Sequence, residues 1–271
     1  MTDDDIDAGL ALCRSAGWNQ LANDWKIFLE LDPDGNRVAI DENNKVVGTV
    51  TTVTYEDHFS WIGMVLVDPS KKRQGIGTQL LREALKILEQ QETIKLDATP
   101  AGREVYLKLG FKDEYILSRM VTADLSKSPS INLEQISLND LNVIFQTDEK
   151  IFGASRKDLL KKIHESYPQF SFQIKKENGI SYSFGRKGFN FTQVGPIVAD
   201  NSEEAVLLAT AAFKNISGAV ALDVMKGSAF HQWLTSIGFT EQRELIRMYR
   251  GKNAYPGTPE KQFTILGPEF G

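Results

Sequence analysis

The chain has few of the residues that build disulfides and metal sites. It contains one cysteine, Cys13, and three histidines scattered along the sequence. A single cysteine forms no internal disulfide, and the histidines do not cluster with other ligand types, so no metal site is expected. The acidic start MTDDDID differs from the basic start of a secretory signal. We therefore expect a reducing, cytoplasmic location.

Long apolar runs and an excess of positive charge are lacking as well. No stretch approaches the roughly 18 apolar residues that a membrane helix needs. The formal net charge is −5, from 31 Lys and Arg against 36 Asp and Glu. Nucleic-acid binding requires a clustered cationic excess, so we expect neither a membrane nor a nucleic-acid partner. The 271 residues, 41% of them hydrophobic, are enough for two soluble domains.

The sequence does contain an internal repeat. The stretch LDATPAGREVYLKLGF, starting at Leu96, resembles LDVMKGSAFHQWLTSIGF, starting at Leu222. In each copy an Arg-Met pair follows the closing Phe by eight positions, at Arg119 and Arg247. Helix-like and strand-like segments alternate in both copies, which predicts two α/β units. We place them at residues 1–127 and 128–250, followed by a tail at 251–271.

Apolar periodicity predicts helices near residues 4–15, 20–30 and 76–90, and strands at 37–40, 46–54 and 61–67. A strand at IKLDA and a short helix at AGREVYLKLG follow. The next segment, FKDEYILSRMVTADL, is predicted to form a hairpin.

The segment DPSKKRQGIGTQLL, residues 68–81, carries Gly75 and Gly77 between a strand and a helix. A Gly-x-Gly turn at a helix start presents unpaired backbone N–H groups, and the helix dipole adds positive charge, so an anion such as phosphate is favoured there. The loop is not a P-loop, which needs GxxxxGK[ST]. It also fits a dinucleotide loop poorly, because seven residues separate Val67 from Gly75. In the second copy the loop is deleted, and SEEAVLL continues directly from turn into helix.

Three pieces of the first copy occur in a characteristic order: Val67-Asp68-Pro69, the stretch from Lys72 to Thr78, and YLKLGF from Tyr106. Together they resemble the signature of the GNAT superfamily of N-acetyltransferases, in the two-domain type with a degenerate second unit. The resemblance implies an α/β fold (α+β, mixed sheet) of two tandem units, each a splayed mixed β-sheet flanked by helices. Members usually begin with a strand, which MTDDDID does not provide. Either the start is truncated or another segment fills that sheet edge, and QFTIL in the tail is the candidate segment.

The resemblance also implies acetyl-CoA as cosubstrate, without a metal. The glycine loop would hold the pyrophosphate, and the backbone of the preceding strand would contact the pantetheine and the oxyanion. Lys72 stands where Gln or Arg is usual, and Thr99 where many members carry Asn. The implied cofactor-binding residues are Val65, Leu66, Val67, Lys72, Arg73, Gln74, Gly75, Ile76, Gly77, Thr78 and Thr99.

Attack of an amine on a thioester needs a neutral nitrogen, whereas a free alkylamine has a pKa of about 10. A base must therefore take a proton, and the departing thiolate gains from a general acid. The resemblance assigns the acid to Tyr106. Simple aromatic packing is the alternative, but the matching position of the second copy is Leu234, which packs without a hydroxyl. Asp97 is a candidate base, although Asp223 occupies the matching position in a copy without the loop, which leaves a structural role open.

Trp18, Trp25 and Glu56 are candidates for contact with the acceptor, a small-molecule amine or a peptide amino group. Core packing of the two tryptophans and a solvated turn at Glu56 are the alternatives. The expected function is acetyl transfer from acetyl-CoA to an amine by direct attack. A non-catalytic acetyl-CoA-binding sensor is the competing class. The identity of the acceptor, the acyl-chain preference, the base and the oligomeric state stay open at this point.

Overall fold

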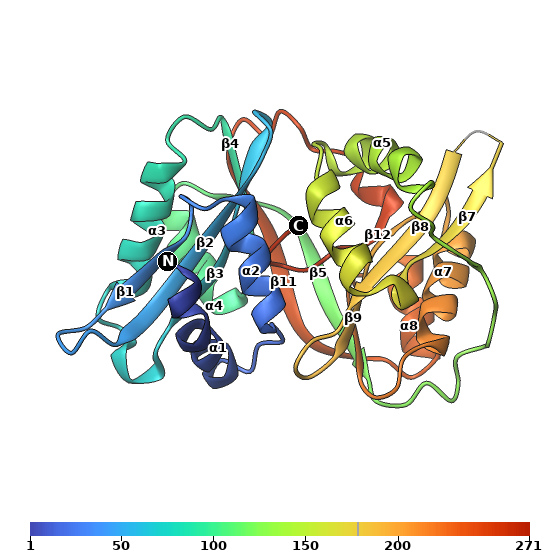
Figure 1. Ribbon diagram of the computed structural model, residues 1–271, viewed down its shortest axis with the longest axis horizontal. Coiled ribbons are helices and arrows are strands. Elements are labelled where there is room, and N and C mark those ends of the chain that lie inside the picture. The colour runs from blue at the N-terminus through green and yellow to red at the C-terminus, as the bar shows by residue number, and fades with distance from the viewer. Residues whose placement is uncertain (178) are drawn as a thin grey trace.

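The computed structural model describes residues 1–177 and 179–271. The chain forms one continuous mixed β-sheet with helices on both faces (Figure 1), which confirms the mixed sheet flanked by helices. The strand order is β1-β2-β3-β4-β11-β5-β10-β9-β8-β7-β6, and β12 pairs with β9 off this path.

The strands are β1 (Arg37–Ile40), β2 (Val46–Tyr55), β3 (Phe59–Val67), β4 (Thr93–Ala98), β5 (Lys112–Thr122), β6 (Glu134–Gln135), β7 (Phe172–Lys176), β8 (Gly179–Arg186), β9 (Thr192–Val198), β10 (Val220–Met225), β11 (Thr240–Gly251) and β12 (Gln262–Thr264). The helices are α1 (Ile6–Ser15), α2 (Ala22–Leu31), α3 (Ile76–Ile87), α4 (Pro100–Lys108), α5 (Leu141–Phe152), α6 (Lys157–Ser166), α7 (Ser202–Lys214) and α8 (Ala229–Ser236).

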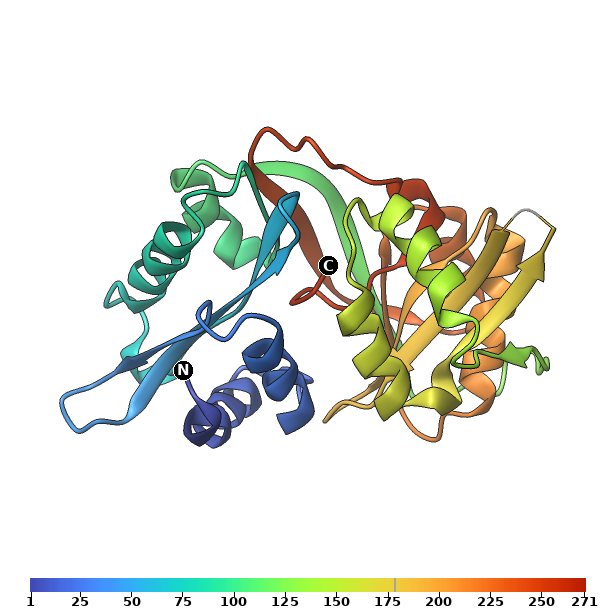
Figure 2. The same ribbon diagram turned by 45° about the horizontal axis from the view of Figure 1, so that its top comes forward.

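Three apolar cores hold the helices to the sheet. Helices α1, α2, α5 and α6 share one core that spans both halves of the molecule and includes Trp25, Phe28, Trp61 and Leu160. Helices α3 and α4 cover the other face of the first half, and α7 and α8 cover that of the second half. Figure 2 shows α1 and α2 on the opposite side of β2 from α3. Because one core is common to both halves, we expect the halves to unfold together.

The last strand of each repeat is exchanged between the halves. Strand β5 lies between β11 and β10, although β5 follows α4 of the first copy in sequence. Strand β11 lies between β4 and β5, so it completes the sheet of the first half. The two strands run side by side through the centre of Figure 2, β5 in green and β11 in red. The hairpin predicted for FKDEYILSRMVTADL is wrong, since this segment forms the single strand β5.

Two buried ion pairs fix the exchanged strands. Arg247 of β11 donates from Nε and Nη2 to the two carboxylate oxygens of Asp97 on β4, at 2.9 and 2.8 Å. Arg119 of β5 pairs in the same way with Asp223 of β10, at 2.8 and 2.6 Å. The arginine repeated in the sequence therefore joins each exchanged strand to the half that it completes.

The tail crosses both halves. Strand β12 pairs with β9, and the N–H of Ile265 donates to the carbonyl of Asp223 on β10 at 3.1 Å. Further along, the Trp61 indole donates to the carbonyl of Pro268 at 2.9 Å, and the Tyr55 hydroxyl donates to that of Phe270 at 2.7 Å. The segment QFTIL is thus not an edge strand of the first half, where β1 forms the edge.

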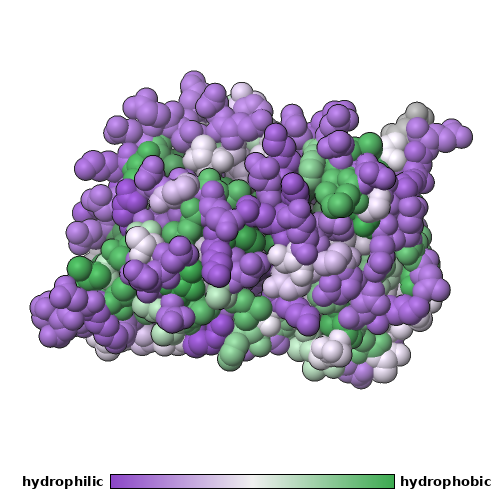
Figure 3. All heavy atoms as spheres, viewed as in Figure 1, coloured by the Kyte–Doolittle hydropathy of each residue, from purple (hydrophilic) through white to green (hydrophobic). Residues whose placement is uncertain are grey.

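The face shown in Figure 3 is mostly hydrophilic, with hydrophobic residues in separate groups. In the part of the chain that the structure describes, no helix has both the length and the apolar character to cross a bilayer.

Candidate active site

The glycine loop adopts a tight turn at the start of α3. Asp68 accepts hydrogen bonds from the backbone N–H and the hydroxyl of Ser70, at 2.9 and 2.7 Å, and so fixes the beginning of the loop. Arg73 and Gly75 have φ values of 63° and 83°, in the left-handed region. Such residues turn consecutive N–H groups toward one side, which forms an anion-binding concavity.

The backbone donors of this loop face open space. Among the described residues, no protein acceptor is recorded for the N–H groups of residues 72–78. A Cβ atom added to Gly75 would meet nothing within 4 Å, and one added to Gly77 would meet only a methyl of Val67 at 3.4 Å. Because α3 begins at Ile76, the positive end of its dipole lies at the same place.

Strand β3 separates from β4 next to this loop. The parallel ladder between them is recorded only at Ser60 and Trp61, so the β4-facing edge of β3 has no ladder partner from residue 63 onward in the described chain. Opposite β2, strand β3 carries a bulge at residues 63–66, where Met64 has a φ of 51°. The Thr49 hydroxyl donates to the Met64 carbonyl at 2.8 Å and holds the bulge. Bulges of this kind re-aim backbone groups beside functional sites.

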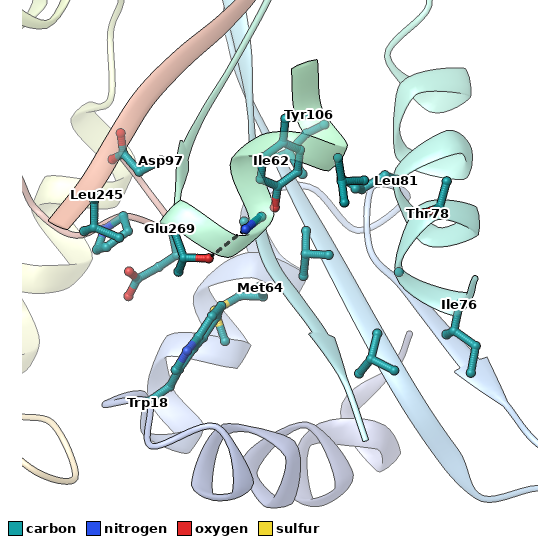
Figure 4. Close-up of a pocket in the computed structure, with 18 of the residues that line it drawn as sticks. Trp18, Ile62, Met64, Ile76, Thr78, Leu81, Asp97, Tyr106, Leu245 and Glu269 are labelled. Carbon is teal, nitrogen blue, oxygen red and sulfur yellow. Dashed lines mark hydrogen bonds between the residues drawn. The ribbon is translucent and has the colours of Figure 1, made fainter. Parts of the chain in front are cut away.

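A cavity of about 370 Å³ connects the loop, the open β3 edge and the helical entry region. In Figure 4, Ile76 and Thr78 mark one end, Asp97, Leu245 and Glu269 mark the other, and Tyr106 lies between them. The residues predicted from the sequence that line this cavity are Trp18, Val65, Val67, Lys72, Arg73, Gly75, Ile76, Gly77, Thr78, Asp97, Thr99 and Tyr106.

Four predicted residues do not line the cavity. Trp25 is fully buried in the core shared by both halves, so it does not contact an acceptor. Glu56 follows β2 at a turn and accepts a hydrogen bond from the Ser155 N–H at 2.9 Å, at a separate hollow. The side chain of Leu66 is in the core, and that of Gln74 is exposed, so only their backbones remain candidates. The structure therefore places Trp25 and Glu56, both expected from the sequence to contact the acceptor, away from the cavity.

Tyr106 extends from α4 into the middle of the cavity (Figure 4). Its ring packs edge-on against Phe111, with centroids 5.9 Å apart, and approaches Gly102, where a Cβ atom would lie 3.1 Å from the ring. No described residue is recorded as a hydrogen-bond partner of its hydroxyl. Burial raises the pKa of Tyr106 to about 12, so the hydroxyl keeps its proton at neutral pH.

Asp97 lines the cavity, but both its carboxylate oxygens accept hydrogen bonds from Arg247. Burial raises the pKa of the Asp97 carboxyl, and the charge of Arg247 offsets part of that rise. Its side chain is 0% exposed. Asp97 also does not cap α4: the cap is Thr99, whose hydroxyl accepts from the Gly102 N–H at 3.2 Å. This geometry supports a structural role rather than that of a base.

The structure adds wall residues that the sequence did not reveal. Glu269 lies against β3, where a Cβ on Gly63 would be 2.8 Å from the Glu269 carbonyl oxygen. The Glu269 carboxylate accepts hydrogen bonds from Gln20 at 2.9 Å and from Arg186. Other added lining residues are Ile62, Met64, Arg119, Arg243, Leu245 and Pro268.

In the part of the second half that the structure describes, no loop is equivalent to residues 72–78. Helix α7 begins at Ser202 directly after Asn201, which caps it by accepting from the Glu204 N–H at 2.9 Å. Glu203 and Glu204 place negative charge in its first turn, which disfavours an anion. In addition, β12 and Ile265 occupy the gap between β9 and β10. Among the described residues, the second half thus has neither the glycine loop nor an open gap between β9 and β10.

Comparison with known families assigns both halves. The Acetyltransferase (GNAT) family matches residues 6–111, and the Acetyltransferase (GNAT) domain matches residues 144–264. The chain therefore belongs to the GNAT acetyltransferases and carries two GNAT units in tandem. Membership supports an acyltransferase that uses an acyl-CoA donor.

Several individual proteins are similar over most of the chain. The holothin acyltransferase of Pseudoalteromonas sp. (strain SANK 73390) is 26% identical over 259 residues, which cover 94% of this chain and 87% of that protein. The uncharacterized N-acetyltransferase YitH of Bacillus subtilis (strain 168) is 22% identical over 198 residues, which cover 71% of this chain and 70% of that protein. The crystal structure of a putative acetyltransferase from Pyrococcus horikoshii superposes with a TM-score of 0.83 at 24% identity, over 100% of this chain and 94% of that one.

Proposed function

We propose that this protein is an N-acetyltransferase that moves the acetyl group of acetyl-CoA to a small amine, in the cavity of the first half. The proposal rests on one arrangement: a single cavity joins the unpaired loop amides of residues 72–78, the open edge of β3 and the unpartnered hydroxyl of Tyr106. These are the donors that a diphosphate, a pantetheine chain and a leaving thiolate would need.

Residues 72–78 would bind the diphosphate of the cosubstrate through backbone N–H groups, aided by the dipole of α3. Lys72 and Arg73 are exposed beside the loop and add positive charge for a polyanion. The backbone of residues 63–67 would hold the pantetheine in place of a neighbouring strand. When bound, acetyl-CoA supplies a thioester whose carbonyl carbon is attacked by a neutral amine.

The chain would promote the reaction in two ways. N–H groups along the open β3 edge would polarise the thioester carbonyl and stabilise the oxyanion. As the C–N bond forms and the C–S bond breaks, Tyr106 would give its proton to the sulfur and regain one from solvent. The nitrogen would lose its extra proton to solvent, because the Asp97 carboxylate is engaged by Arg247.

Replacement of Tyr106 by Phe tests the proposal. Because this removes only the hydroxyl, we expect kcat to fall by roughly 100-fold, a typical general-acid contribution, with almost unchanged affinity for acetyl-CoA. Tyr255→Phe is the control, since Tyr255 is 39% exposed, stacks on His58 and lies outside the cavity. Thiol release with an amine library gives kcat, and calorimetry gives the affinity.

A Tyr106→Phe enzyme as fast as the parent would show that Tyr106 is only a packed aromatic. If the parent binds acetyl-CoA but acetylates no amine, the sensor alternative holds instead.

A further inference from the structure

Arg243 is a charged residue of the cavity that the proposed chemistry does not use. It lies on β11 and lines the cavity together with Leu245, two positions further along the same strand. In Figure 4, Leu245 is at the end of the cavity away from Ile76 and Thr78 of the loop helix. Arg243 is thus placed at the acceptor end, not at the diphosphate end.

The charged side chains Asp97, Arg119 and Glu269 at this end are held in ion pairs within the protein. Asp97 pairs with Arg247, and Arg119 pairs with Asp223. Glu269 shares Arg186 with Asp24. Among the described residues, Arg243 forms no recorded ion pair, and its Nε is buried without a hydrogen-bond partner. Burial and the charge of Arg119 lower the pKa of Arg243 to about 10, so it is still a cation at neutral pH. In the described chain, Arg243 is therefore a cation of the acceptor end whose guanidinium no ion pair holds.

We expect the position of Arg243 to lower the stability of the sheet. In the ladder between β11 and β5, Arg243 lies directly opposite Arg119. Like charges at opposed positions are destabilising, and the buried Nε without a hydrogen-bond partner adds a desolvation cost. By the repeat, Arg243 corresponds to Tyr115, each four residues after the closing Phe. Tyr115 instead accepts a hydrogen bond from Arg247 at 2.7 Å. A residue that weakens the fold at a site wall indicates a ligand that compensates it.

We propose that Arg243 binds a carboxylate of the acceptor, so that the acceptor is a small amine bearing a carboxylate, such as an amino acid. This inference rests on the proposed function. One guanidinium balances one negative charge, and its planar fork of donors matches the two oxygens of a carboxylate. The cavity of about 370 Å³ also receives the end of the cosubstrate, which leaves room only for a small acceptor.

The test compares matched acceptors with the full-length protein. Each α- and ω-amino acid is assayed beside its carboxamide by thiol release from acetyl-CoA. We expect the free acids to exceed the amides in kcat/KM by roughly 10- to 100-fold, the usual worth of a buried charged hydrogen bond. Arg243→Gln should remove this preference without lowering the melting temperature, and Arg243→Lys should keep part of it. Arg250→Gln, an exposed arginine of the same strand outside the cavity, should leave the preference intact.

A binding measurement separates this inference from the proposed function. N-acetylglycine and N-acetylglycinamide are titrated into the protein with coenzyme A, and tryptophan fluorescence reports binding, since Trp18 lines the cavity. Stronger binding of the acid, lost in Arg243→Gln, supports carboxylate recognition even if no amine is acetylated. Turnover of amines with equal kcat/KM for acids and amides in the parent overturns the inference and leaves the acetyltransferase proposal standing. If the protein shows no preference for the carboxylate and acetylates no amine, both the inference and the acetyltransferase proposal are overturned.

Discussion

The two arginine–aspartate pairs provide an internal control for the role of Asp97. Asp97→Asn removes the charge that neutralises Arg247, and Asp223→Asn does the same to Arg119 in the other half. The side chains of Asp97 and Asp223 are 0% exposed, and those of Arg247 and Arg119 are 5% and 4% exposed. If both carboxylates only hold exchanged strands, the two substitutions should have similar effects.

The magnitude follows from leaving a buried cation unpaired, which costs about 3–5 kcal/mol. For Asp97→Asn the lower end is expected, because Arg247 keeps two other partners. It donates a hydrogen bond to the Tyr115 hydroxyl at 2.7 Å, and its guanidinium lies over the Trp61 ring, 4.6 Å from the centroid. For Asp223→Asn the upper end is expected, because the side-chain amide of Gln193 also donates to the Asp223 carboxylate, at 2.7 Å in the parent. The substitution removes that acceptor as well. Urea unfolding followed by tryptophan fluorescence gives the free energy of unfolding.

The two variants also separate structure from catalysis. At low temperature, where both are folded, we expect kcat at saturating amine to stay within about threefold of the parent, far less than the 100-fold typical of a lost base. The reasoning would be refuted if Asp97→Asn kept the parent's stability within about 1 kcal/mol and lost kcat, while Asp223→Asn did not. Asp97 would then be the general base.

Three further predictions concern the cosubstrate and the pH dependence of stability. Calorimetry should give one acetyl-CoA per chain; a stoichiometry of two would contradict the loss of the second site. Gly75→Val and Gly218→Val introduce similar backbone strain, about 1 kcal/mol each, because the two glycines have φ values of 83° and 97°. Only Gly75→Val should weaken acetyl-CoA binding. Equal affinities of the two variants would argue against cosubstrate binding by the glycine loop. Burial lowers the pKa of Lys95 from 10.5 to about 8, so between these values the unfolded chain holds a proton that the folded one lacks. The free energy of unfolding of the parent, relative to that of Lys95→Met, should therefore rise by ~2–3 kcal/mol as the pH increases across this window. If urea titrations give a difference that does not change with pH, Lys95 is not buried as a neutral amine.

The sequence by itself determined the features that depend on local geometry. Gly75 and Gly77 at a helix start predict an anion-binding loop, because the left-handed turn and the free amides are properties of a few consecutive residues. The repeat identified two units, and the absence of the loop from SEEAVLL marked the second unit as different. Tyr106 could be singled out because the matching Leu234 packs without a hydroxyl.

The tertiary structure decided which strand completes which half. Strands β5 and β11 share the Arg-Met pattern, so either one fits beside β4, and local periodicity does not distinguish them. The same exchange puts Arg243 opposite Arg119 and brings Glu269 against Gly63. These contacts join residues more than 100 positions apart, and their energies depend on burial and on the charges nearby, which no short segment of sequence specifies.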